Sequence, residues 1–481
     1  MKKILLSLFA VLLSCSAWAE NVEIDGINYS LNEETKEASV IEKTPKYSGD
    51  IVIPSSVVYS NLTYSVTSIG KGAFNRCRKF SVKIPNSVVS IGESAFEYSS
   101  LSSIEIPNSV TSIGYRAFQN CSSLTSIEIP NSVTSIDKEA FFECYYLASI
   151  DIPNSVTSIG RYAFFSTTWY DNQPEGLVYA GRVAYKYKGT MPENTSIVIK
   201  DGTTAISGSA FEGCTGLTSI EMPNSMKSIG DWAFMNCSGL TSINFPNGFT
   251  SIGDYVFQGC TSLTSIVIPH SATRIGYQAF YDCTALTSVE ILNDATSIGG
   301  KAFFNTAWYN NYPYGMVYIG KVAYSYKGSM PSNTSIGLKE GTTEISDEAF
   351  SRRTALISIE IPNSVTYIGN SVFMNCSGLT SIICEAITPP TLGTYVFDKV
   401  DKSACILYVS SQSVEAYKSA DQWKDFNSIL PIDPTGINAI ENVQLANDKF
   451  FDYDGREIPL PQKGVNIVKK ANGQTIKVFV K

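Results

Sequence analysis

The single histidine of the sequence, His270, is the first residue that nucleophilic catalysis would require. A Ser-His-Asp triad or a Cys-His dyad uses a histidine as its general base. His270 stands where other copies of a recurring Ile-Pro-Asn-Ser phrase carry asparagine, so a turn residue is the simpler interpretation. The sequence has no C-x-x-C pair, phosphate-binding loop or dinucleotide fingerprint. We therefore predict a protein that is not an enzyme and has no cofactor or metal.

Cysteine is the second residue type that could be chemically reactive, and the sequence contains eleven cysteines. Eight of them lie three residues after a recurring phenylalanine: Cys77, Cys121, Cys144, Cys214, Cys237, Cys260, Cys283 and Cys376. An exported protein could link them as disulfides. We favour a small buried apolar residue, because Ser99 fills the same position in one copy. Cys384 and Cys405 lie outside this series and could bridge within a terminal cap.

Carboxylates recur at one position of successive copies, at Glu105, Glu128 and Asp151. We interpret them as a solvated acidic face, because charge runs usually have that role. The alternatives are a weak calcium site or a contact for a basic partner. Calcium requires six or more oxygen ligands, which three carboxylates do not obviously supply.

Aromatic residues gather in two matching insertions that are offset by 139 residues. Tyrosine and tryptophan dominate binding hot spots and stack on sugars. Against this, about half of the aromatic side chains of a hairpin usually pack on the protein body. The insertions nevertheless supply the candidate binding residues Trp169, Tyr170, Tyr179, Tyr185, Tyr187, Trp308, Tyr309, Tyr318, Tyr324 and Tyr326.

A repeated phrase must position all of these residues. It reads Leu-Thr-Ser-Ile-Glu-Ile-Pro-Asn-Ser-Val-Thr-Ser-Ile-Gly-x-x-Ala-Phe-x-x-Cys, and its phenylalanine recurs every 22 to 24 residues, apart from two steps of 47. A fixed period of this length predicts a solenoid, in which each turn buries its apolar residues only against its neighbours. Within a turn, Leu124, Ile127 and Ile129 predict a short strand. A glycine such as Gly114 or Gly160 is expected to permit a sharp bend.

This phrase resembles the BspA-type leucine-rich repeats of bacterial surface proteins, and the resemblance covers roughly residues 50–430. It implies a leucine-rich repeat solenoid, β-rich and right-handed, with short parallel strands on one face and short helical or extended pieces on the other. It also implies adhesion to host proteins and to other cells.

The remaining segments give the expected layout of the chain. Residues 1–19 read as a signal peptide with an A-x-A cleavage site, a looser lipoprotein signal being the alternative. Residues 20–49 are expected to cap the solenoid of residues 50–387, whose inserts lie at about 165–195 and 304–334. Residues 388–435 form the C-terminal cap, with a helix expected over Ser413 to Phe426. The tail at 436–481 carries Asp454-Gly455-Arg456, then Gly464-Val465-Asn466-Ile467-Val468, then a basic terminal strand at 474–481. This order resembles the sorting domain of type IX secretion, although the tail is shorter; a small β appendage without a sorting role is the alternative.

Composition limits the partners. The formal net charge is −8 and no basic stripe is present, so nucleic acid is a poor partner. No segment after residue 19 is long and apolar enough to predict a transmembrane helix. We predict a secreted or outer-membrane surface protein that mediates adhesion through its repeat face, with extracellular host or bacterial proteins as partners. The alternative is a carbohydrate-binding surface protein that uses the aromatic inserts.

Overall fold

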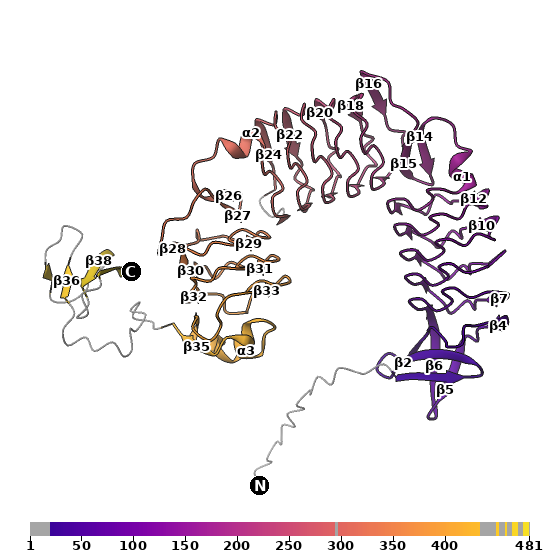
Figure 1. The fold of residues 1–481 in the computed structure, drawn as a ribbon, viewed down its shortest axis with the longest axis horizontal. Coiled ribbons are helices and arrows are strands. Elements are labelled where there is room, and N and C mark those ends of the chain that lie inside the picture. Colours follow the sequence, from indigo (N-terminus) through magenta and orange to yellow (C-terminus); the bar gives the residue numbers. More distant parts are fainter. Residues whose placement is uncertain are drawn as a thin grey trace, which may run out of the picture. The chain divides into compact units, whose positions relative to one another are not determined.

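The computed structural model describes residues 20–293 and 297–432 and four strands within residues 449–480 (Figure 1). Contacts divide the chain into two compact units. Unit 1 is Met1–Asn293 with Ala302–Asn311, and unit 2 is Asp294–Lys301 with Tyr312–Lys481. Both are built from stacked turns with very short strands and few helices, which is the predicted β-rich solenoid of leucine-rich repeats.

A regular turn contributes two short strands. In one such turn these are β10 (Ser126–Glu128) and β11 (Ser135–Ile136). Each pairs in parallel with the equivalent strand of the next turn, so that Ile127 lies beside Ile150 and Ile136 beside Ile159. Ile127 is buried while Glu128 is exposed, because successive side chains of a strand point to opposite faces. The repeat phrase therefore forms two parallel ladders.

Unit 1 begins with an antiparallel hairpin of β1 (Glu20–Ile24) and β2 (Ile27–Asn32), turned at Asp25 and Gly26. Both turn residues have positive φ, which matches a two-residue hairpin turn. The sheet continues through β3 (Glu37–Val40), β6 (Leu62–Ile69), β8 (Ser90–Ile91), β9 (Ser112–Ile113), β11 and β13 (Ser158–Ile159), with β5 (Ser56–Tyr59) beside β6. Two smaller pairs are β4 (Gly49–Val52) with β7 (Phe80–Lys83), and β10 with β12 (Ser149–Asp151).

The first insertion interrupts these ladders with helix α1 (Thr168–Asp171) and the antiparallel strands β14 (Gly176–Ala180) and β15 (Val183–Lys188). The second strand, β15, starts a new ladder with β17 (Ala205–Ile206), β19 (Ser228–Ile229), β21 (Ser251–Ile252) and β23 (Arg274–Ile275). The other ladder resumes as β16 (Thr195–Val198), β18 (Leu217–Glu221) and β20 (Ser242–Ile243), followed by β22 (Ser265–Ile268) with β24 (Ser288–Ile291). Helix α2 (Ala307–Asn310) also belongs to unit 1.

Unit 2 repeats this plan. It contains β25 (Ser297–Ile298) and two ladders. The first ladder consists of β26 (Gly315–Ile319), β27 (Val322–Lys327), β29 (Glu344–Ile345), β31 (Tyr367–Ile368) and β33 (Thr391–Leu392). The second consists of β28 (Thr334–Gly337), β30 (Leu356–Ile361), β32 (Ser381–Cys384), β34 (Ile406–Val409) and β35 (Ser428–Pro431). Its tail strands β36 (Lys449–Phe451), β37 (Glu457–Ile458), β38 (Gly464–Lys469) and β39 (Thr475–Val480) pair antiparallel in the order β37-β36-β38-β39.

The helix expected over Ser413 to Phe426 is shorter in the structure. Helix α3 covers Val414–Ser419 between the 3-10 turns η1 (Ser411–Ser413) and η2 (Trp423–Asp425). Ala420 is extended and Gln422 has φ +58°, so the backbone leaves the helical region between these turns. Tyr417, Trp423 and Phe426 are nevertheless buried.

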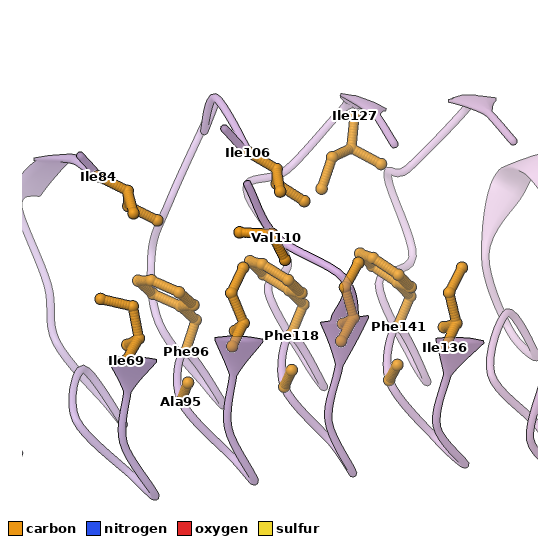
Figure 2. Close-up of a cluster of buried hydrophobic side chains, with 14 of the residues drawn as sticks. Ile69, Ile84, Ala95, Phe96, Ile106, Val110, Phe118, Ile127, Ile136 and Phe141 are labelled. Carbon is orange, nitrogen blue, oxygen red and sulfur yellow. The ribbon is translucent and has the colours of Figure 1, made fainter. Parts of the chain in front are cut away.

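The recurring phenylalanine forms the centre of each turn. In unit 1 the rings of Phe96, Phe118 and Phe141 stack on one another with centroids 5.1 Å apart. Figure 2 shows these parallel rings between Ile106 and Ile127 on one side and Ile69 and Ile136 on the other. The amide of Phe118 donates to the carbonyl of Ala140 in the next turn at 2.7 Å. The phenylalanine segment is thus a tight turn joined to its neighbours by hydrogen bonds.

The glycine after the second strand has a different role from the expected sharp bend. A Cβ added at Gly114 would lie 2.8 Å from the carbonyl carbon of Gly92, and one at Gly160 would lie 2.2 Å from the amide nitrogen of Lys138. Neither contact is sterically allowed. Glycine is required here because neighbouring turns approach each other through their backbones.

The repeated cysteines are buried thiols in the structure, apart from the half-buried Cys214, as the favoured interpretation predicted. The thiol of Cys144 donates to the carbonyl of Phe118 in the preceding turn at 3.0 Å, and Cys260 donates to Phe234 at 3.2 Å. The position therefore suits a small residue with a weak donor, which explains why serine can replace it.

A bridge between Cys384 and Cys405 is contradicted by the strand register. Cys384 lies beside Val409, whereas Cys405 precedes Ile406, which lies beside Ser381. The two cysteines are thus four residues apart along the ladder, or about 13 Å, while a disulfide needs Cα atoms within about 7 Å. Cys384 instead accepts a hydrogen bond from the hydroxyl of Tyr417 at 3.1 Å.

We expect the thiols outside the signal segment to be unreactive in the folded protein. Burial raises the pKa of Cys214 to about 11 and that of Cys405 to about 12, so little thiolate forms near neutral pH. Titration with a thiol reagent should therefore be slow in buffer and complete in denaturant. Rapid native labelling, or missing thiols after denaturation without reductant, would contradict this expectation.

Candidate binding surfaces

The acidic positions that recur in three successive turns are presented to solvent; Glu128 and Asp151 lie in β10 and β12, whereas Glu105 lies outside any strand. Glu105, Glu128 and Asp151 are all exposed, and Glu128 lies directly beside Asp151 across the β10–β12 pair. These three carboxylates make no ion pair with a basic side chain of the described residues. Residues 20–293 and 297–432 also contain no group of three or more His, Cys, Asp or Glu that could hold a metal ion. The surface can therefore offer negative charge to a basic partner.

Four of the aromatic candidates in the insertions are core residues. Tyr170, Tyr185, Tyr309 and Tyr324 are at most 6% exposed. Trp169 and Trp308 are half-buried and meet Phe164 and Phe303 edge-on, with ring centroids 5.2 and 5.1 Å apart. The four buried tyrosines are consequently not available to a partner, so the structure removes them from the ten candidate binding residues.

Tyr185 shows why an insertion needs a buried tyrosine. In regular turns the phenylalanine amide donates to an alanine carbonyl of the next turn, as Phe141 does to Ala163 at 2.8 Å. At the insertion the amide of Phe164 donates instead to the hydroxyl of Tyr185, also at 2.8 Å. The side chain replaces a missing backbone acceptor, so the ladder continues without an unpaired buried amide.

The insertion helices begin with matching caps. The hydroxyl of Thr167 accepts from the amide of Tyr170 at 3.1 Å, and Thr306 accepts from Tyr309 at 3.0 Å. Such threonine caps satisfy amides that a helix leaves unpaired. The two insertions therefore begin their helices with the same threonine cap.

The remaining candidates are half-buried. The hydroxyls of Tyr179 and Tyr318 accept from the amides of Lys200 and Lys339, each at 3.0 Å. Tyr187 and Tyr326 pack beside Phe211 and Phe350, with ring centroids 6.4 and 6.5 Å apart. These four side chains retain some accessible surface, as Trp169 and Trp308 do, but each also has a structural contact.

Four exposed aromatic side chains that the sequence analysis missed lie in the turns that lead to the first insertion. Tyr98, Tyr145, Tyr146 and Phe165 are 43%, 51%, 66% and 38% exposed. Phe165 stacks near Phe142, with ring centroids 6.2 Å apart. The available signal was the presence of large rings within two residues after the recurring phenylalanine or cysteine, outside the buried positions of the repeat phrase.

A second missed feature is a hollow of about 420 Å³ on the strand face of unit 1. Its lining residues are Ser196, Ser219, Ile220, Glu221, Met222, Asn224, Ser242, Ile243, Asn244, Phe245 and Pro246. The sequence signal was a departure from the repeat phrase, since Asn244 and Phe245 replace the usual Glu-Ile.

His270 is exposed in the turn that follows β22, consistent with a turn residue. Among the described residues, none of the helices has the length and apolar character needed to cross a membrane.

Comparison with known proteins identifies the repeat. The family described as BspA type leucine rich repeat region matches residues 54–169, 184–309 and 311–419, which is more than half of the chain. No curated protein sequence matches. A solved leucine-rich repeat protein from Bacteroides ovatus is 26% identical, covering 86% of this chain and 100% of its own, with a TM-score of 0.28.

Two further solved structures are similar. A leucine rich cell surface protein from Faecalibacterium prausnitzii is 23% identical over 76% of this chain and 94% of its own, with a TM-score of 0.25. The pneumococcal vaccine antigen PcpA is 16% identical over 86% of this chain and 99% of its own, with a TM-score of 0.30.

Proposed function

Because the chain belongs to the family of BspA-type leucine-rich repeat proteins, we propose that it is a bacterial surface protein that adheres to extracellular proteins of a host or of other bacteria. The contact surface is the exposed acidic face that Glu105, Glu128 and Asp151 form on three successive turns. Its mechanism is multivalent binding, in which a partner meets the same side chains on several successive turns.

The observation that carries this proposal is the exposed acidic ladder. Glu105, Glu128 and Asp151 point to solvent on neighbouring turns, about 4.8 Å apart where the strands pair. Like charges at this spacing repel each other unless they are solvated or opposed by positive charge. A basic surface of a partner protein would relieve that repulsion, which gives the face both attraction and selectivity.

Residues 1–19 lie outside the described part of the chain, as do residues 452–456, which include the Asp-Gly-Arg motif of the tail. We propose that the first segment directs export and that the tail is a sorting domain for attachment at the outer membrane. Its antiparallel strands β36 to β39 are compatible with a small β domain of either role. Deletion of residues 436–481 should leave the protein in the periplasm if the tail sorts it, and fractionation of cells measures this.

Binding to immobilised extracellular-matrix proteins tests the adhesive function. We expect the full chain to bind, and we expect Trp169→Phe with Trp308→Phe to leave binding within about twofold. These substitutions keep a ring against Phe164 and Phe303 but change the insertion surface. A loss of binding in this variant would show that the contact surface lies on the insertions and not on the strand face.

A further inference from the structure

The hollow on the strand face arises where a parallel ladder opens. Pairing of β18 with β20 consists of Ser219 beside Ser242 and Ile220 beside Ile243, and then stops. In unit 2 the equivalent strands β30 and β32 continue for two more pairs, which join Glu360 to Ile383 and Ile361 to Cys384. The residues that follow Ile220 and Ile243 are therefore separated by a space that the second copy of the block closes.

The lining of this space is mainly polar. The hydroxyls of Ser196 and Ser219 are 2.7 Å apart, and the exposed residues Glu221, Asn224 and Asn244 also line the hollow. Hydroxyl and amide groups can both donate and accept hydrogen bonds, whereas a carboxylate only accepts. No lysine, arginine or histidine lines the hollow.

One wall of the hollow is apolar and held in place. Phe245 packs against Phe249 with ring centroids 4.5 Å apart and meets Phe257 edge-on at 6.2 Å. Phe245 is half-buried and lines the hollow together with Met222. A wall that is already ordered lowers the entropy cost of binding.

We propose that the hollow between β18 and β20 binds one sugar unit of a neutral glycan. A sugar presents hydroxyls that both donate and accept, together with a C–H face that can pack on an aromatic ring. Serine hydroxyls, asparagine amides and Glu221 complement the first feature, and Phe245 with Met222 complements the second. The volume of about 420 Å³ lies within the range of small-molecule sites, roughly 300–1,000 Å³. Glu221 disfavours sulfated or carboxylated sugars by charge repulsion.

Binding of the full chain to soluble oligosaccharides tests this proposal by isothermal titration calorimetry. The probes are cellotetraose, maltotetraose and mannotetraose, with a heparin tetrasaccharide as the anionic comparison. We expect at least one neutral probe to bind at millimolar concentration and the heparin probe not to bind. Glu221→Gln removes a charged acceptor and should weaken the binding by about tenfold. The matched control Glu290→Gln, also exposed on the strand face but outside the hollow, should change it less than twofold.

A second variant closes the hollow with residues that the chain already uses. Asn244→Ile with Phe245→Cys copies Ile383 and Cys384 from the equivalent closed pair and should abolish binding. Absence of binding by all three neutral probes, equal binding by the variants, or a preference for heparin would overturn the proposal. The glycan site is a function additional to protein adhesion. The same variants should keep their binding to matrix proteins, so a failure of the glycan proposal can be distinguished from a failure of the adhesive function.

Discussion

Replacing Phe118 with alanine should lower the free energy of unfolding by about 3–5 kcal/mol, because it removes a fully buried ring and leaves a cavity. Phe118 is 0% exposed and stacks on Phe96 and Phe141, so both neighbouring turns lose a contact. Urea unfolding followed by circular dichroism measures the change. Hydrogen exchange of peptides that contain Phe96 and Phe141 measures how far the loss spreads, since each repeat contacts mainly its neighbours.

The matched control for this substitution is Phe165→Ala. Phe165 is 38% exposed and lies outside the central stack, so we expect a loss below about 1 kcal/mol. If Phe118→Ala destabilised the protein no more than Phe165→Ala, the stack of phenylalanine rings would not be the main source of stability.

The second large effect concerns Tyr185. Tyr185→Phe removes the hydroxyl that accepts from the amide of Phe164, and Phe164 is 0% exposed, so the amide loses its partner inside the core. Leaving such a group unpaired costs about 1–3 kcal/mol. Burial raises the pKa of Tyr185 well above its usual value, so the hydroxyl stays neutral throughout the accessible pH range.

Tyr187→Phe is the control for Tyr185→Phe, since Tyr187 is half-buried two residues along the same strand. We expect its effect to stay within about 0.5 kcal/mol. Equal losses in the two variants, measured by urea unfolding, would show that the hydroxyl of Tyr185 does not complete the ladder.

The period of the sequence predicted the solenoid and its core because the physical cause is local and repeated. The position of each phenylalanine identified the stacked centre of a turn, and alternation identified Ile127 as buried and Glu128 as exposed. Contacts between turns could not be predicted in this way. The need for glycine at positions such as Gly160 depends on how closely the neighbouring backbone approaches.

The candidate sites were predicted less well, because composition does not show which side of a short insertion faces the core. Tyr170 and Tyr185 resemble binding residues in the sequence but fill the end of a ladder in the structure. The hollow depends on where the pairing of β18 and β20 stops, which is a property of two turns together. The separation of Cys384 from Cys405 likewise follows from register.

The most direct test of adhesion through the acidic face compares two triple variants with reversed charges. The measurement is the affinity of the full chain for an immobilised matrix protein. One variant changes Glu105, Glu128 and Asp151 to lysine. The other changes the exposed Glu33, Glu34 and Glu193, which lie outside the strand-face ladder, and so shifts the net charge equally. The proposed function predicts a loss of at least about tenfold in the first variant and less than twofold in the second. Equal affinities in both variants would contradict it.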